Sequence, residues 1–310
     1  MKKPELLVTP HSVDEIAPLI EAGADAFIIG EEQFALRLAG DFKWDDLKEA
    51  VQLIKGAQKK VYVAINAVFT NDLLGPLGAY LEKLKGLDID GLRFSDPGAY
   101  LLAKETVPVD LHWSSETLGT NYFTANYWVQ RGIKRVVLAP EIEKTAVLET
   151  KAQATGEIEV LVHGAVSMFH SRRELLGNYM KFQGETVSAP KGIHDGYTIY
   201  DPERELFYPI FEDSQGTHIF NGSDVCMIDD LEDLLDAGIG AFRIDSILKS
   251  REYRLQTTAA YRMAIDLACQ DRNRYRQVGR GLYKKMEEIQ PEGRKLDRGF
   301  YYKPSIYKHQ

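Results

Sequence analysis

The sequence predicts a parallel α/β barrel of the (β/α)8 TIM type, with a small β-rich insertion after strand seven and a basic, aromatic C-terminal tail. A strand pattern followed by a helix pattern recurs eight times along the 310 residues. Three predicted helices end near a Gly and enter a strand within a few residues, in segments 21–30, 85–94 and 236–245. The alternative, an open doubly wound sheet, would need a glycine-rich phosphate turn after an early strand, and the sequence has no GxGxxG or Walker motif.

The predicted strands are short apolar runs, as expected for parallel strands that are covered on both faces. In order they are 5–9, 26–30, 61–68, 91–96, 109–116, 135–141, 157–165 and 241–245. Helices follow them, opening for example at Ser12, a natural N-cap, and at Pro97, which suits a first helical position. Another long helix is expected over 250–270.

Two segments extend the barrel. Residues 1–270 are expected to form it, with an insertion at about 167–223 that contains the alternating runs YTIYD and ELFYPIF between turn signals. A structureless loop of that length would be unusual in a compact domain. Residues 271–310 are expected to form a helix and a tail packed on the barrel.

The net charge of −8 is unevenly distributed. Residues 271–310 contain 11 Lys and Arg against 5 Asp and Glu, a balance of +6, so the remainder carries −14. Six aromatic residues accompany these cations: Tyr275, Tyr283, Phe300, Tyr301, Tyr302 and Tyr307. This pattern suits either RNA binding, by phosphate pairing and base stacking, or a solvated helix with a docked tail, and composition favours the second.

Cysteine content and hydropathy indicate a cytoplasmic protein. The two cysteines, Cys226 and Cys269, offer no disulfide framework and suit a reducing compartment. The N-terminus lacks a secretory signal pattern, and no apolar run has the length of a membrane span, so we expect no membrane partner. The sequence contains no HxH, HExxH or CxxC spacing, so no metal site is expected, and it has no GxSxG nucleophile motif.

Polar residues follow seven of the eight predicted strands, and in a barrel such positions meet at one face. The candidate catalytic residues are Glu31, Glu116, Glu141, His163 and Asp245. The candidate substrate-binding residues at this face are Arg37, Asn66, Asp96 and Asn121. Carboxylates at strand ends also cap helices, and a histidine there is as often a hydrogen-bonded core residue as an acid or base.

The segment from Glu159 to Tyr179, which contains VHGAVSMFHSRRELLGNY, resembles the signature region of the U32 peptidase-like family. Segments 23–42, 208–253 and 297–302 resemble three further stretches of that family in the same order. The resemblance implies a role in hydroxylation of RNA bases or of ubiquinone precursors, for which many members hold an iron–sulfur cluster through four cysteines.

The chain departs from that cluster pattern. Ser167 and Glu174 stand where the first two cluster cysteines are usual, the third has no counterpart in 178–200, and only Cys226 matches the fourth. One thiolate cannot hold such a cluster, so we expect this chain alone to bind none.

This variant of the signature resembles a short branch without a cluster, linked to synthesis of 5-hydroxyuridine at the tRNA wobble position. The resemblance implies a component of wobble-uridine hydroxylation that acts with tRNA and with a longer paralogue, whose four cysteines carry the iron–sulfur cluster. It also implies prephenate as a metabolite, which Arg37, Arg172 and Arg173 would suit, with Asn178 and Tyr179 as further substrate-binding candidates. Where the family often has an Arg, this chain has Pro140.

Two alternatives remain. The chain is a collagenase-like U32 peptidase, or it is a non-catalytic ligand-binding barrel subunit. For direct tRNA contact, the sequence offers two local basic patches, 272–303 and the Arg172–Arg173 pair.

Overall fold

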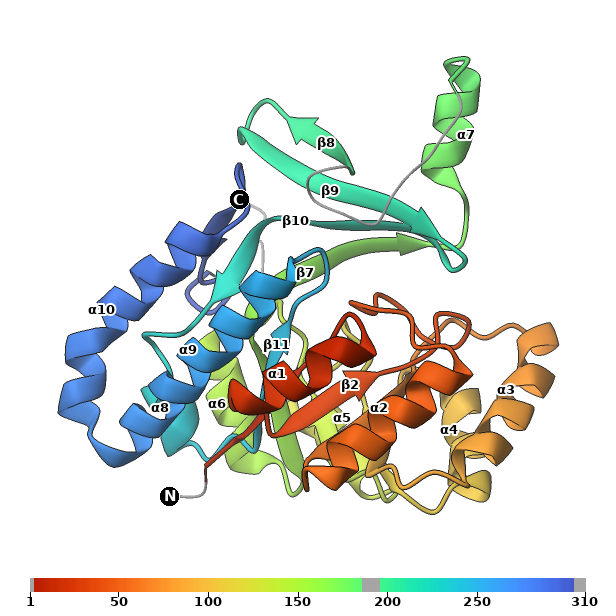
Figure 1. Cartoon of the computed structure of the whole chain (residues 1–310), viewed down its shortest axis with the longest axis horizontal. Helices are drawn as coiled ribbons and strands as arrows, with labels where there is room; N and C mark the ends of the chain where they lie inside the picture. Colours follow the sequence, from red (N-terminus) through yellow and green to blue (C-terminus); the bar gives the residue numbers. More distant parts are fainter. Residues whose placement is uncertain (1–2, 186–195, 304–310) are drawn as a thin grey trace.

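The computed structural model describes residues 3–185 and 196–303. Parts of the predicted insertion and of the predicted tail, including Tyr307, lie outside the described residues. The chain forms a barrel ringed by helices, from which an antiparallel sheet projects on one side (Figure 1).

The barrel consists of eight parallel strands in sequence order, and it is closed because β11 pairs with both β1 and β7. This arrangement confirms the predicted TIM fold. Each predicted strand is present, although several are shorter than their apolar runs. The strands are β1 (Glu5–Val8), β2 (Ala26–Ile29), β3 (Lys60–Ile65), β4 (Gly91–Phe94), β5 (Asp110–Trp113), β6 (Arg135–Val137), β7 (Glu157–Ser171) and β11 (Ala241–Asp245).

Helices connect the strands on the outside of the barrel (Figure 1). Ser12 was expected to cap the first one, but its hydroxyl donates to the Asp14 side chain and the chain continues as a 3-10 turn, Val13–Glu15. The helices are α1 (Ile16–Glu21), α2 (Trp44–Gly56), α3 (Asn71–Leu84), α4 (Pro97–Thr106), α5 (Tyr122–Val129), α6 (Lys144–Gln153), α8 (Glu232–Asp236) and α9 (Arg251–Gln270).

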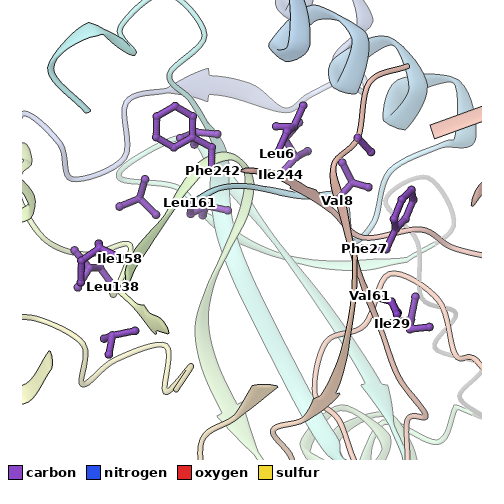
Figure 2. Close-up of a cluster of buried hydrophobic side chains, with 14 of the residues drawn as sticks. Leu6, Val8, Phe27, Ile29, Val61, Leu138, Ile158, Leu161, Phe242 and Ile244 are labelled. Atoms are coloured by element: carbon purple, nitrogen blue, oxygen red, sulfur yellow. The ribbon is translucent and has the colours of Figure 1, made fainter. Parts of the chain in front are cut away.

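Alternation along the strands divides the apolar side chains between two layers. Leu6, Val8 and Phe27 belong to the large cluster between strands and helices, part of which Figure 2 shows. Their neighbours Leu7 and Ile28 belong to a separate small cluster with Tyr62, Ala64 and others inside the barrel. The main core therefore lies outside the barrel wall, and the interior is available for polar groups.

The insertion forms an arm, defined here as the described residues 167–185 and 196–223. Strand β7 runs past its predicted end to Ser171, because β10 (Gly216–Cys226) pairs with it antiparallel beyond the barrel. The sheet continues through β9 (Leu206–Asp213) to β8 (Tyr197–Asp201). The arm also contains α7 (Leu175–Phe182), a helix that the sequence patterns did not reveal.

The C-terminal region docks on the barrel through α10 (Arg272–Ile289), beside α9, and through β12 (Lys295–Asp297), which pairs with β10. The buried Tyr301 hydroxyl donates to the Leu161 carbonyl at 3.1 Å. Arg294 is buried against Asp224, and Arg298 donates to the Cys226 carbonyl at 2.7 Å. Both arginines thus bind groups of the protein itself, which agrees with the docked tail that composition favoured over RNA binding.

Candidate functional site

A pocket of about 70 Å³ opens at the carboxyl ends of the barrel strands. A buried water needs roughly 10–15 Å³ on the same measure, so the pocket has room for a small ligand. Its wall includes Arg93 of β4, Leu161 of β7 and Phe220 of the arm. Among the sequence-predicted residues, the structure brings five together here: Arg37, Asn66, Glu116, Glu141 and Asp245.

Arg37 and Glu116 form an ion pair beside the pocket. Arg37 Nε donates to Glu116 Oε1 at 3.0 Å, and Arg37 Nη2 contacts the same carboxylate. Both residues have left-handed backbones, with φ of 53° for Arg37 and 60° for Glu116. Such conformations are uncommon for residues with side chains and concentrate at functional sites. Arg37 Nη1 is buried and has no hydrogen-bond partner among the described residues.

A buried network of arginines around Glu159 lies inside the barrel, and sequence analysis missed it. Arg93 binds the Glu159 carboxylate through two bonds of 2.7 and 2.9 Å, and Arg243 Nε lies 3.4 Å away. Burial alone would raise the pKa of Glu159, but Arg93, Arg135 and Arg243 hold it below its ordinary value. Charged residues at alternate positions of otherwise apolar strands were the available signal, since alternate residues share one face.

Asp245 is a carboxylate of the pocket whose pKa is shifted by its surroundings. Burial raises its pKa, and the contact with Arg243 opposes that shift only in part. Its Oδ1 accepts from the Ile247 backbone N–H at 3.2 Å. A carboxyl group with a raised pKa can exchange a proton with a ligand nearer neutral pH than an ordinary aspartate.

Asn66 and Glu141 shape the pocket in different ways. Asn66 Oδ1 accepts from the Leu36 backbone N–H at 3.1 Å, which fastens the Arg37 loop to the end of β3. Glu141 is exposed at the rim. Glu31, only partly buried, is not among the side chains that line the pocket.

The other sequence-predicted residues lie away from the pocket. Asp96 caps α4, accepting from the Gly98 and Ala99 N–H groups at 2.7 and 3.0 Å, and Asn121 caps α5 through Thr124 N–H at 2.9 Å. Arg172 donates to Thr70 Oγ1 at 3.3 Å, between the arm and the loop after β3. Three further candidates are exposed on the arm: Arg173, Asn178 and Tyr179.

His163 lies behind the pocket wall instead of in it. Its ring is fully buried, its Nε2 is 2.6 Å from the Tyr253 hydroxyl, and burial lowers its pKa to about 3. The imidazole is therefore neutral at physiological pH and packs between β7 and α9. Of the two alternatives for this residue, the geometry supports the hydrogen-bonded core histidine.

The residues at the cluster-cysteine positions do not fit an iron–sulfur cluster. Cys226 is fully buried, burial raises the pKa of its thiol to about 12, and its Sγ lies 3.8 Å from the Tyr261 hydroxyl. Ser167 lines the pocket, and exposed Glu174 precedes α7. A cluster takes several thiolates, and a protonated thiol is a poor ligand. Across 3–185 and 196–303, no group of three or more His, Cys, Asp or Glu side chains is arranged to hold a metal ion.

Comparison with known proteins places the chain. It is 48% identical over 309 residues to tRNA hydroxylation protein P2 of Bacillus subtilis (strain 168), covering 99% of this chain and 100% of that protein. It is 27% identical to tRNA hydroxylation protein P1 of the same organism, covering 87% of this chain and 65% of that protein. A solved U32 peptidase superposes with a TM-score of 0.52 at 13% identity, over 79% of this chain and 94% of that one, which supports the fold.

None of the helices in the described residues is long and apolar enough to cross a membrane. The model of peptidase family U32 matches residues 11–310, and the matched region includes the arm, the docked C-terminal segment and every residue that lines the strand-end pocket except Thr9. This match, together with the full-length similarity to tRNA hydroxylation protein P2, confirms the resemblance drawn from the signature residues. The chain therefore belongs to peptidase family U32.

Proposed function

We propose that this chain is a component of tRNA hydroxylation, acting in the synthesis of 5-hydroxyuridine at the wobble position. The observation that carries the proposal is its 48% identity, over the full length of both chains, to a protein named for tRNA hydroxylation. The pocket supports it, because ligands of TIM barrels bind at the strand ends, where Arg37, Glu116 and Asp245 meet.

The small-molecule ligand of the pocket is an anion, for which prephenate is the candidate. Arg37 supports this assignment, since its Nη1 is buried with no acceptor in the part of the chain that the structure describes, while Nε and Nη2 are held by Glu116. A guanidinium group has five N–H donors in a fixed plane, so Arg37 can bind Glu116 and still donate from Nη1 to a ligand carboxylate. Arg37 would bind the ligand carboxylate, Glu116 would orient Arg37, and Asp245 would hold or release a proton beside it.

The partner in this proposal is a longer paralogue that carries the four-cysteine iron–sulfur cluster. Bacillus subtilis has both P2, which this chain matches over its whole length, and P1, of which this chain spans 65%. Of the cluster-cysteine positions that this chain matches, only Cys226 carries a thiol, and it is buried, so the cluster is assigned to the other protein. Contact of this chain with tRNA is part of the same proposal.

The pocket gives the peptidase alternative little support. Its hydroxyl side chains are those of Thr9, Ser114, Thr117 and Ser167, and no histidine is found among the described residues that line it. A serine or threonine nucleophile needs an adjacent base within hydrogen-bond reach. Hydroxylation remains the function that both the comparisons and the pocket favour.

Nucleoside analysis of bulk tRNA tests the proposal. A deletion strain should lose 5-hydroxyuridine and its derivatives, and the wild-type gene should restore them. Deletion of the paralogue alone and of both genes shows whether the two proteins act together. An unchanged nucleoside profile in the double-deletion strain would refute the proposed function. If Arg37→Lys restores the nucleoside as well as wild type does, Arg37 does not bind a ligand that the modification needs.

A further inference from the structure

Helix α7 carries two apolar stripes, of which only one is buried. Leu176 and Met180 pack against Ile210 of β9. Leu175, Tyr179 and Phe182 follow the spacing i, i+4, i+7, which places them along one face of a helix. Their side chains are 41%, 57% and 85% exposed. A helix in a small arm needs one apolar stripe for packing, so the second one has another use.

Two further apolar side chains are exposed on the arm, nearer to the pocket in sequence. Met168 and Phe169 of β7 are also exposed, and they directly follow Ser167, which lines the pocket. The arm is fixed over the barrel, because Ser214 Oγ donates to Glu32 Oε1 at 2.7 Å and Gln215 Nε2 donates to the Gln33 carbonyl at 3.0 Å. The arm therefore has a defined position relative to the pocket.

Cations accompany these aromatic residues. Arg172, Arg173 and Lys181 are exposed beside them, in a chain whose net charge is −8. Within the described residues, no ion pair is found for Arg173 or Lys181, whereas Arg172 donates to the Thr70 hydroxyl and its charge also acts on the Asp72 carboxylate. The nearby acids are Glu174, Glu185, Asp72 and Glu212, and the Glu212 carboxylate accepts from the Leu176 and Gly177 N–H groups at 2.6 and 2.9 Å.

The other end of the arm has the opposite charge. Asp201, Glu203 and Glu205 cluster at the turn between β8 and β9, with Arg204 as the accompanying cation. An anionic polymer would be repelled more strongly from this turn than from the β7–α7 end, where Arg172, Arg173 and Lys181 are exposed. Charge complementarity thus selects the end of the arm that carries the exposed aromatic stripe.

We propose that the end of β7 and α7 form a stacking platform for unpaired bases of RNA. Phe169, Tyr179 and Phe182 supply the rings, and Arg172, Arg173 and Lys181 meet the phosphates. Aromatic faces beside cations are how proteins hold single-stranded nucleic acid with little sequence preference. The platform rests on the proposed function, and it specifies the surface by which the substrate loop reaches the pocket.

Binding of a labelled 17-nucleotide anticodon stem–loop, measured by fluorescence anisotropy with the full chain alone and mixed with its paralogue, tests the platform. The double variant Tyr179→Leu, Phe182→Leu keeps the apolar bulk but loses the rings, and should weaken binding at least about fivefold. Phe182→Trp should bind as tightly as wild type or more tightly. Tyr127→Leu on α5, a half-exposed tyrosine outside the arm, is the matched control and should have no effect.

Salt dependence tests the cations separately. The triple variant Arg172→Gln, Arg173→Gln, Lys181→Gln should reduce the log–log salt slope by about 0.7 for each phosphate that the protein no longer neutralises. The platform is refuted if wild-type protein shows no salt-sensitive RNA binding, either alone or mixed with the paralogue. It is also refuted if the leucine and glutamine variants bind RNA like wild type. Variants that keep RNA affinity but no longer bind the paralogue would make this face a protein-docking surface, which also refutes it.

The proposed function is tested by a different measurement, the 5-hydroxyuridine content of tRNA. If the deletion strain lacks 5-hydroxyuridine while the Tyr179→Leu, Phe182→Leu strain retains it and the purified variant keeps its RNA affinity, the platform fails and the function stands. If the deletion strain has normal tRNA, the function fails whatever the anisotropy shows.

Discussion

Arg37 Nε lies 3.0 Å from Glu116 Oε1, although 79 residues separate the two in sequence. One residue comes from the loop after β2 and the other from the loop after β5, and each has a left-handed backbone conformation. Each such conformation costs about 1–3 kcal/mol, so the surrounding fold must hold both. The pair joins two loops across the pocket mouth and leaves one nitrogen of Arg37 for a ligand.

Arg37→Lys should reduce the 5-hydroxyuridine content of tRNA about tenfold or more, because an ammonium cannot replace a fork that binds Glu116 and a ligand together. The variant is expressed in the deletion strain, and nucleosides are quantified by mass spectrometry. Arg272→Lys is the control, since Arg272 pairs with Asp236 in an exposed ion pair between α10 and the end of α8. Equal nucleoside content in both strains would contradict the assigned role of Arg37.

Arg294→Ala should lower the free energy of unfolding by about 3–5 kcal/mol, because it leaves the fully buried Asp224 carboxylate with one cation fewer. Asp224 also binds Lys249 and accepts from Gln290 Nε2 at 2.8 Å. Lys295→Ala, the exposed next residue, should change stability by no more than about 0.5 kcal/mol.

Urea denaturation followed by circular dichroism measures both variants. A similar small effect for Arg294→Ala and Lys295→Ala would mean that the C-terminal region is not anchored through Asp224. Because Arg294 is structural, its substitution is unsuitable for testing RNA binding.

His163 should make stability depend on pH. Its pKa is about 3 in the folded protein and about 6.5 in an unfolded chain, so between these values only the unfolded state binds the proton. Its contribution is therefore complete above pH 6.5, and the free energy of unfolding falls by about 1.4 kcal/mol per pH unit below it.

His163→Gln should reduce the slope of the free energy of unfolding against pH by an amount that corresponds to roughly one proton per molecule. Urea denaturation at several pH values between 4 and 7 measures that slope. The slope should not vanish, because burial also lowers the pKa of His112 and that histidine remains in the variant. An unchanged slope would mean that titrating groups other than His163 cause the pH dependence of stability.

Cys226 should resist alkylation in the native protein. It is fully buried and burial raises the pKa of its thiol to about 12, so almost none of it is thiolate at neutral pH. Iodoacetamide followed by peptide mass spectrometry should label Cys269, which is partly exposed, before Cys226. Both should react in 6 M urea, and rapid native labelling of Cys226 would contradict its buried position.

The barrel could be predicted because its evidence is local. An apolar run predicts each strand, a capping or terminating residue predicts the end of each helix, and eight alternating units favour closure of the barrel. The same order places every strand-end residue at one face, so Arg37, Glu116 and Asp245 could be named together. Helix α7 was not predicted, because Leu175, Tyr179 and Phe182 are apolar residues on the exposed face, where an amphipathic helix usually has polar ones.

The sequence by itself determined the order of strands and helices and which face would carry the polar ends. The tertiary structure decided what each polar side chain binds. Asp96 and Asn121 turn to cap the helices that they precede, Arg37 and Glu116 meet across the pocket, and Arg294 is buried against Asp224. Periodicity reports the direction of a side chain within its own element, but a partner up to 79 residues away is selected only when strands and loops pack together.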